Sequence, residues 1–82
     1  MAHYVYILRS LRTGRLYVGT TDDVTRRVDE HNRGASRGTK PWRPWQLVYA
    51  ERHSDAGAAR RREWRLKCTP AGGKEKRRLA GH

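Results

Sequence analysis

The stretch His3-Tyr-Val-Tyr-Ile-Leu-Arg9 decides the fold, together with the turn signal Thr13-Gly14 and the segment Arg15-Leu-Tyr-Val-Gly-Thr20 that follows it. Both longer segments are rich in aromatic and β-branched residues, which favour strands. Because Thr13-Gly14 lies between them, the first twenty residues predict a β-hairpin. The first segment has apolar side chains on both faces, which is typical of a central or well-covered strand.

Three helices and one more strand are predicted after the hairpin. Each helix begins at residues that cap helices well, such as Thr21-Asp22-Asp23. We expect a last short helix from Thr69-Pro70 to be weakened by Gly72-Gly73, since glycine is a poor helix former. The other predicted elements are a helix over about 23–32 that stops at Gly34, a strand over 45–51 and a helix over about 56–67.

The predicted order is β-β-α-β-α, with the short helix at the end. It indicates a small α/β (α+β) sandwich around a three-stranded, mostly antiparallel sheet. The length of 82 residues allows one domain, over 1–82. No stretch reaches the roughly 20 apolar residues of a membrane span or resembles a signal peptide, so we expect a cytoplasmic protein without a membrane partner. The single cysteine, Cys68, excludes an internal disulfide and a zinc site built from cysteines.

The charge of the chain points to a polyanionic partner. Nineteen basic residues face eight acidic ones, for a net charge of +11, and fifteen of the nineteen are arginine. The net charge is +1 over residues 1–30 and +10 over residues 31–82. Arginine matches phosphate oxygens well, so nucleic acid is the simplest partner. The alternative explanation is an origin in a generally basic, arginine-rich proteome.

Two polar residues share the apolar face of the first predicted helix. At about 100° per residue, Val24 and Val28 mark the face that packs on the sheet, and Arg27 and His31 fall on the same side. One interpretation is structural: Arg27 extends past the helix edge and His31 bonds a backbone carbonyl. The pairing of the two at i and i+4 favours a functional site.

The second predicted helix carries a carboxylate on its apolar face. Glu63 falls within the stripe formed by Ala59 and Leu66. A carboxylate there is costly unless it is paired or holds a metal. A salt bridge to Arg27 or another arginine is the structural alternative, and a functional cluster with Arg27 and His31 is the interpretation we favour. Tyr6 and Tyr17 join this cluster only if the hairpin register places them on one face, which the sequence leaves open.

These residues, in this order and spacing, resemble the GIY-YIG nuclease domain. The match comprises Tyr4-Val5-Tyr6, then Tyr17-Val18-Gly19, then Arg27 and His31 on the next helix, and Glu63 on the following one. It covers nearly the whole chain and is most similar to the stand-alone, single-domain branch. Segments 25–31, 43–49 and 62–67 also read like that branch. The resemblance implies a three-stranded sheet flanked by helices and metal-dependent phosphodiester cleavage.

The resemblance also implies a role for each matched residue. Tyr6 and Tyr17 would be the motif tyrosines, one of which handles the proton of the attacking water, and Gly19 would keep the second strand bare beside the site. Arg27 would hold the scissile phosphate and His31 would assist near the water or the leaving group. Glu63 would bind one Mg²⁺ or Mn²⁺ ion, in keeping with the preference of Mg²⁺ for one carboxylate and several waters.

The chain departs from the family pattern at three places. Tyr4 and Val5 replace the glycine and isoleucine of the first motif, and Thr20 stands where many members have a basic residue. An asparagine that larger members carry after the last helix has no counterpart in 68–82. These departures are compatible with weak or lost activity.

The segment 33–44 is the expected contact surface for nucleic acid. Two glycines and two prolines predict an irregular loop there. Basic side chains in it can pair with phosphates, and an exposed tryptophan can stack on a base. We expect Trp45 to be in the core and Trp42 to be more exposed. The predicted contact residues are Arg33, Arg37, Lys40, Trp42 and Arg43.

Two functions from different classes follow from these patterns. The first is a small Mg²⁺-dependent endonuclease that acts on DNA, with structured or damaged DNA in repair or recombination as the substrate. The second is a catalytically silent module that kept the fold and binds DNA or RNA. A weaker third option is an RNA-directed or ribosome-associated accessory protein. Without a second DNA-binding domain, the chain is expected to need a structured substrate or a partner protein for targeting.

Overall fold

The structure is a computed structural model that describes residues 2–81. The elements follow the order β-β-α-β-α-α, which confirms the predicted fold class. The segment 33–44, expected to be an irregular loop throughout, contains one turn of 3-10 helix at Lys40–Trp42. The strands and helices are β1 (His3–Ser10), β2 (Leu16–Thr21), α1 (Val24–Arg33), β3 (Trp45–His53), α2 (Ala56–Cys68) and α3 (Pro70–Leu79).

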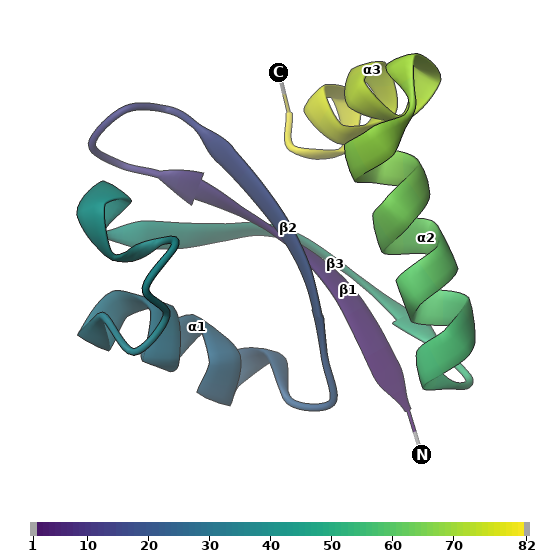
Figure 1. The fold of residues 1–82 in the computed structure, drawn as a ribbon, viewed down its shortest axis with the longest axis horizontal. Helices are drawn as coiled ribbons and strands as arrows, with labels where there is room; N and C mark the ends of the chain where they lie inside the picture. Colours follow the sequence, from purple (N-terminus) through teal and green to yellow (C-terminus); the bar gives the residue numbers. More distant parts are fainter. Residues whose placement is uncertain (1, 82) are drawn as a thin grey trace.

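The three strands form one antiparallel sheet with β1 in the centre. The strand order is β2-β1-β3, and both pairings are antiparallel. The central place of β1 agrees with its apolar side chains on both faces. Helix α1 lies on one side of the sheet, and α2 and α3 lie on the other (Figure 1).

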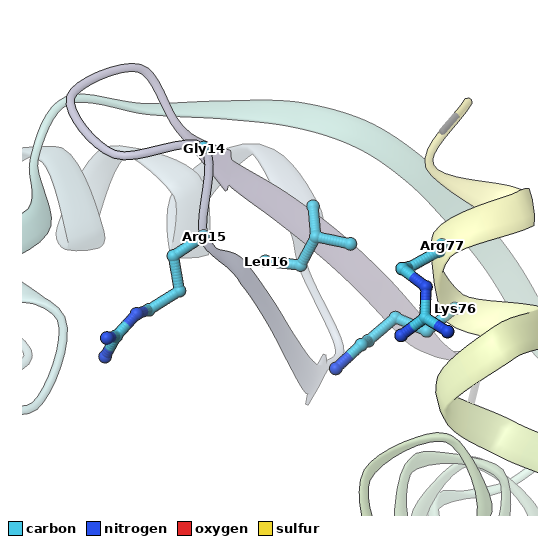
Figure 2. A pocket seen from close by; sticks show the side chains of 5 residues that line it. All are labelled: Gly14, Arg15, Leu16, Lys76 and Arg77. Atoms are coloured by element: carbon cyan, nitrogen blue, oxygen red, sulfur yellow. The ribbon is translucent and has the colours of Figure 1, made fainter. Parts of the chain in front are cut away.

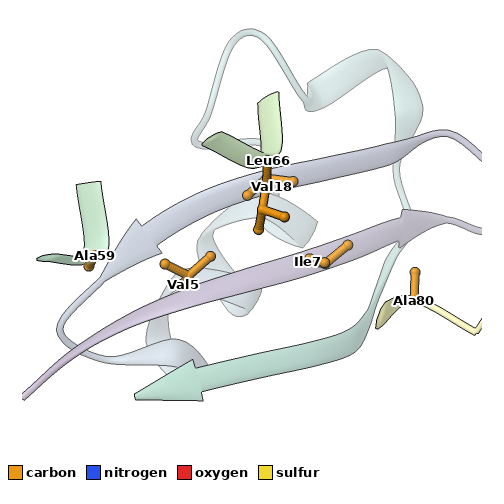
Figure 3. Packing of buried hydrophobic residues seen from close by; sticks show 6 residues of the cluster. All are labelled: Val5, Ile7, Val18, Ala59, Leu66 and Ala80. Atoms are coloured by element: carbon orange, nitrogen blue, oxygen red, sulfur yellow. The ribbon is translucent and has the colours of Figure 1, made fainter. Parts of the chain in front are cut away.

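Each face of the sheet has its own buried cluster. Against α2 and α3 the cluster is aliphatic, and Val5 and Ile7 of β1 lie at its centre (Figure 3). On the α1 side Tyr6, Leu8 and Trp45 form the buried cluster, and Val24 and Val28 of α1 pack against it. The alternation along β1 follows from the two-residue period of a strand.

The helix ends use the capping residues that the sequence predicts. The side chains of Asp23 and Asp55 accept hydrogen bonds from backbone N–H groups at the starts of α1 and α2, and Thr69 does the same for α3. Gly34 ends α1 with a φ of 82°, a left-handed conformation that glycine adopts without strain.

Helix α3 is longer than its glycines suggest, because one of them has a packing role. It runs for ten residues through Gly72-Gly73. Gly72 is buried, and a side chain there would collide with the backbone carbonyl of Arg65 in α2. The low helix propensity of Gly72 is thus offset by a close approach of the two helices.

Across residues 2–81, no helix has the length and apolar character needed to cross a membrane.

Candidate active site

Tyr6 of β1 and Tyr17 of β2 lie side by side on the α1 face of the sheet. In the antiparallel register Tyr6 lies opposite Gly19, and Tyr17 lies opposite Leu8. The two tyrosines are therefore diagonal neighbours on one face, with ring centroids 6.3 Å apart. The register that the sequence left open brings the two motif tyrosines together.

Gly19 leaves the space that the Tyr6 phenol occupies. A Cβ atom at position 19 would lie 2.5 Å from Oη of Tyr6 and 3.0 Å from a ring carbon of Tyr17. A Cβ atom does not lie this close to another non-bonded atom unless one of the two groups moves. Any other residue at position 19 would therefore push the Tyr6 ring out of place.

His31 of α1 is buried and is held by two side chains. Its Nε2 lies 2.9 Å from Oη of Tyr6, and its Nδ1 lies 2.7 Å from Oγ1 of Thr39. Its ring also meets the Tyr17 ring edge-on, at a centroid distance of 5.1 Å. Both nitrogens thus bond to side chains, and the backbone-carbonyl bond considered for His31 is absent from the described residues, 2–81.

The hydrogen bonds around Thr39 assign the tautomer of His31. The Thr39 hydroxyl donates to the carbonyl oxygen of Ser36, 3.4 Å away, so it can accept a bond from Nδ1–H of His31. Nε2 then has no proton and accepts the hydroxyl proton of Tyr6. The chain of donors runs from Tyr6 through His31 to Thr39, and each member is buried.

Burial keeps both Tyr6 and His31 uncharged near neutral pH. Desolvation, and to a lesser extent Tyr17, raise the pKa of Tyr6 to about 12. Desolvation, followed by the nearby Arg27 cation, lowers the pKa of His31 to about 4. A neutral phenol and a neutral imidazole are the forms that can share one hydrogen bond in a buried place.

Arg27 lies at the solvent margin of this pair. Its side chain is 31% exposed, and its Nη1 donates to Oε1 of Glu30 at 2.9 Å. The guanidinium is close enough to counteract part of the rise in the Tyr6 pKa and to depress the pKa of His31. Helix α1 therefore positions a cation over the edge of the tyrosine–histidine pair, and Glu30 fixes its direction.

Glu63 of α2 lies close enough to Tyr6 for its charge to act on the phenol, and its neighbour Lys67 reaches Tyr17. Its side chain is 23% exposed, so it lies at the margin of the Ala59–Leu66 stripe instead of inside it. Its ion-pair partner is Lys67, at 2.9 Å, and not Arg27 or another arginine as the structural alternative proposed. The ammonium of Lys67 lies 5.1 Å from the ring centroid of Tyr17. The charge of Glu63 also contributes, as the smallest of several causes, to the raised pKa of Tyr6.

The predicted site residues divide by their access to solvent. Tyr6 and His31 are buried, whereas Tyr17, Arg27 and Glu63 are each partly exposed. Only the second set can touch a substrate without rearrangement. Tyr6 and His31 support the partly exposed residues from beneath.

One carboxylate is available to hold a divalent cation here. The residues 2–81 contain no group of three or more His, Cys, Asp or Glu side chains arranged for a metal. Glu63 has one oxygen, Oε2, on Lys67, and its other oxygen has no hydrogen-bond partner within the described chain. A partly exposed carboxylate with one unengaged oxygen fits Mg²⁺, which keeps most of its water ligands.

The predicted nucleic-acid loop is basic and largely exposed. Arg37 and Lys40 are exposed, Arg43 is partly buried beside Gly34, and Arg33 is engaged with Asp29 at 2.9 Å. These cations extend from Arg33, the last residue of α1, to Arg43, just before β3.

The tryptophans are placed differently from one another. Trp45 is 4% exposed, as expected, and Trp42 is only partly buried. Trp42, however, packs against the core cluster and carries the guanidinium of Arg15 at 4.2 Å from its ring centroid, so one of its faces is occupied. Trp64 on α2 is 61% exposed, and the sequence patterns did not single it out.

Sequence reasoning missed three residues that shape the site. Thr39 holds His31, Glu30 directs Arg27, and Lys67 neutralises Glu63 beside Tyr17. The i, i+3 and i, i+4 spacings could have suggested the two ion pairs. Thr39 lies in an irregular loop, where no periodicity indicates which way a side chain points.

A family model described as the GIY-YIG catalytic domain matches residues 2–76. The chain therefore belongs to the GIY-YIG family, as the resemblance of its motifs predicts.

The relatives of the chain are named UPF0213 proteins. It is 42% identical over 67 residues to the UPF0213 proteins of Staphylococcus aureus strains Mu3 and N315, and the match covers 80% of each chain. The solution NMR structure of the UPF0213 protein BH0048 from Bacillus halodurans is similar, with a TM-score of 0.55 and 35% sequence identity. That likeness covers 93% of this chain and 81% of the other.

Proposed function

We propose that the chain is a small, metal-dependent endonuclease that hydrolyses phosphodiester bonds in DNA. The observation that supports this most is the set of partly exposed groups around the buried Tyr6–His31 pair. A phenol from Tyr17, a guanidinium from Arg27 and a carboxylate from Glu63 can supply the proton acceptor, the phosphate ligand and the metal ligand of metal-assisted phosphodiester hydrolysis.

Arg27 is the phosphate ligand in this proposal. Its guanidinium has more donors than Glu30 uses, and it is 31% exposed, so it can reach an incoming phosphate. A phosphate beside Arg27 would offset its positive charge and stabilise the bound position of the substrate. The same donors then face the oxygens on which negative charge grows during hydrolysis.

Tyr17 is the residue we assign to the attacking water. In its phenolate form it takes a proton from the water as the new P–O bond forms, and the 3′ oxygen leaves and is protonated by solvent. Tyr17 returns its proton to solvent afterwards, so the proton count closes. The ammonium of Lys67 lies 5.1 Å from the ring centroid of Tyr17, so a cation stands beside this side chain.

Glu63 would hold a Mg²⁺ or Mn²⁺ ion, which supplies electrostatic stabilisation of the phosphoryl and leaving oxygens when bound. For this the side chain must exchange its contact with Lys67 for the cation. Tyr6, His31 and Thr39 position Tyr17 and Arg27, because their buried hydrogen bonds fix the surface on which those two residues lie.

The substrate is DNA in preference to RNA, and structured or damaged DNA in preference to plain duplex. The basic loop at 33–44 adds phosphate contacts with Arg37 and Lys40, but it offers no element that would read a base sequence. Recognition by DNA shape, or targeting by a protein partner, is therefore part of the proposal.

One observation favours the second candidate, a silent module that binds DNA or RNA. Glu63 is already neutralised by Lys67 at 2.9 Å. In a silent module this ion pair would be the permanent state of the carboxylate.

The experiment is a cleavage assay on a panel of labelled nucleic-acid structures, with Mg²⁺, with Mn²⁺ and with EDTA. Wild type is compared with Glu63→Gln and with the control Glu75→Gln, whose carboxylate is 29% exposed and pairs with Arg62 instead of facing the site. We expect cleavage by wild type and by Glu75→Gln, and none by Glu63→Gln. Binding by Glu63→Gln should persist or tighten, because a negative charge near the phosphates has been removed.

Melting curves of the same variants separate the two functions. If Glu63 were a structural partner only, Glu63→Gln would lose thermal stability while wild type showed no metal-dependent cleavage. A stable Glu63→Gln variant that cleaves at the wild-type rate would remove Glu63 from the mechanism.

A further inference from the structure

A pocket of about 280 Å³ lies between the start of β2 and helix α3, away from the tyrosine–histidine pair. Leu16 projects toward α3, and the side chains of Lys76 and Arg77 project from α3 toward β2 (Figure 2). Gly14 and Arg15 complete the lining. Its volume is close to the lower end, about 300 Å³, of ordinary small-ligand sites.

The positive charge of this pocket comes from α3. Lys76 and Arg77 supply it, and the five lining residues include no carboxylate. The side chain of Arg15 points away from these two cations (Figure 2), because its guanidinium lies 4.2 Å from the ring centroid of Trp42. The acid next along the helix, Glu75, is already engaged with Arg62 at 2.6 Å and with Arg78 at 3.5 Å. Within residues 2–81, the side chains of Lys76 and Arg77 form no ion pair, so their charges are free for an anion.

Arg9 of the neighbouring strand β1 adds a positive charge on the same face of the sheet but does not line the pocket. Arg9 of β1 lies opposite Leu16 in the register, so the two side chains share a face of the sheet. Nη2 of Arg9 donates to the carbonyl of Ala80 at 2.6 Å, whereas its buried Nε has no partner in the described chain. The two cations that face the pocket are thus Lys76 and Arg77, beside the small apolar floor that Leu16 provides.

The edge strand β2 connects the pocket with the candidate active site. Leu16 contributes to the pocket, and the next residue, Tyr17, points to the opposite face beside His31. The two Cα atoms are only about 3.8 Å apart. A strand of nucleic acid that crosses the outer edge of β2 would therefore reach both places.

We propose that this pocket binds a phosphate group of the nucleic acid, as a second anchor beside the active site. The proposal rests on nucleic acid being the substrate, as argued above. It assigns a ligand class to Lys76 and Arg77, and it gives the C-terminal helix a defined contact instead of a diffuse attraction. The phosphate is either an internal phosphodiester or a terminal phosphate, since both present oxygens of the same kind to these donors.

The first test uses inorganic phosphate and NMR of the ¹⁵N-labelled protein. We expect saturable amide shifts centred on residues 14–16 and 76–77, which disappear in the double variant Lys76→Ala/Arg77→Ala. If no shifts occur at these residues, or if the shifts persist in the double variant, phosphate does not bind in this pocket. This test does not depend on cleavage, so it remains decisive if the proposed nuclease function fails.

The second test measures the salt dependence of binding to a DNA panel in EDTA. The matched control is Lys74→Ala/Arg52→Ala, which removes the same charge from exposed positions outside the pocket. We expect the slope of log K against log salt to fall by about 0.9 for each lost duplex phosphate contact in the pocket variant only. Equal slopes in the two double variants would show that the pocket has no phosphate contact with DNA.

Comparing the binding of 5′-phosphorylated and unphosphorylated strands distinguishes a terminal phosphate from an internal phosphodiester as the ligand of the pocket. A terminal phosphate predicts a preference for the phosphorylated strand that the pocket variant loses. An internal phosphodiester predicts equal binding of both strands, with the same loss of salt slope.

Discussion

Strand β1 gives Val5 and Ile7 to one face of the sheet and Tyr6 and Leu8 to the other, and the two faces differ in what they bury. Against α2 and α3 the buried side chains are aliphatic. Against α1 the buried set includes a phenol, an imidazole and a threonine hydroxyl in one chain of hydrogen bonds. Aliphatic burial stabilises the fold without further requirements, whereas buried polar groups must all be paired. The α1 face therefore has a cost in stability that a function would explain.

The largest expected effect comes from removing one hydroxyl from each face. Tyr17→Phe on the α1 face should lower cleavage by about 10²–10⁴-fold, the usual range for loss of a general base. Tyr49→Phe is the matched control, because Tyr49 is also partly buried and packs on the aliphatic cluster, where its hydroxyl donates to Glu51 at 2.8 Å. It should cost about 1 kcal/mol of stability and leave cleavage per folded molecule unchanged. Similar rates for the two variants would contradict the assignment of chemistry to the α1 face.

The next effect is the pH dependence of stability on the α1 face. The pKa of buried His31 is about 4 in the folded protein, below the ordinary 6.5. As the pH falls, this histidine therefore takes up a proton in the unfolded chain before it does so in the folded protein. The free energy of unfolding should thus be highest above pH 6.5 and fall by about 3 kcal/mol as the pH drops from 6.5 to 4. Urea unfolding at a series of pH values measures this loss.

The control for the pH effect is His31→Gln, which removes the titrating group. The charged groups that act on His31 are Arg27 and, more weakly, Glu30. The pKa values of Glu30 and Glu51 are also lowered in the folded protein. The stability that these two carboxylates contribute is therefore lost only as the pH falls through the usual carboxyl range and below. A loss between pH 6.5 and 5 that persists in His31→Gln would show that another group is responsible.

Two glycines give a third comparison, because each face contains one that tolerates no side chain. Gly19→Ala places a Cβ atom 2.5 Å from the Tyr6 hydroxyl, and Gly72→Ala places one against the Arg65 carbonyl. Overpacking of this kind costs about 1–3 kcal/mol. We expect Gly72→Ala to lower the melting temperature and leave cleavage per folded molecule intact. Gly19→Ala should lower cleavage as well, because Tyr6 is displaced. Loss of cleavage in Gly72→Ala, at a temperature where this variant is folded, would contradict the assignment of cleavage to the α1 face alone.

The sequence predicts the elements well because local signals mark them. Segments rich in aromatic and β-branched residues, the turn at Thr13-Gly14 and the caps at Asp23 and Asp55 are short-range features, and all lie where expected. Helical spacing also places Arg27 and His31 on the sheet side of α1. The resemblance of the motifs adds the family, which composition and periodicity alone do not identify.

Contacts between distant segments explain what the sequence leaves undetermined. The register of the hairpin decides whether Tyr6 and Tyr17 meet, and a slip of one residue would separate them. Glu63 lies on the margin of its apolar stripe and pairs with Lys67, because α2 packs mainly through Ala59 and Leu66. Gly72 has a packing role only because α3 folds back onto α2.

The smallest predicted effect concerns Thr39, which belongs to the α1 face through a loop and not through a helix or strand. Thr39→Val keeps the shape but removes the oxygen that accepts the Nδ1–H of His31, 2.7 Å away. The buried N–H is then unpaired, which costs about 1–3 kcal/mol of stability. Because the tautomer and ring position of His31 are no longer fixed, cleavage should fall and its pH profile should change shape. Thr39→Ser restores the hydroxyl and should recover both stability and the wild-type profile. A Thr39→Val enzyme that loses stability but keeps the wild-type rate and pH profile would limit Thr39 to a structural role, and the polar chain of the α1 face would then end at His31.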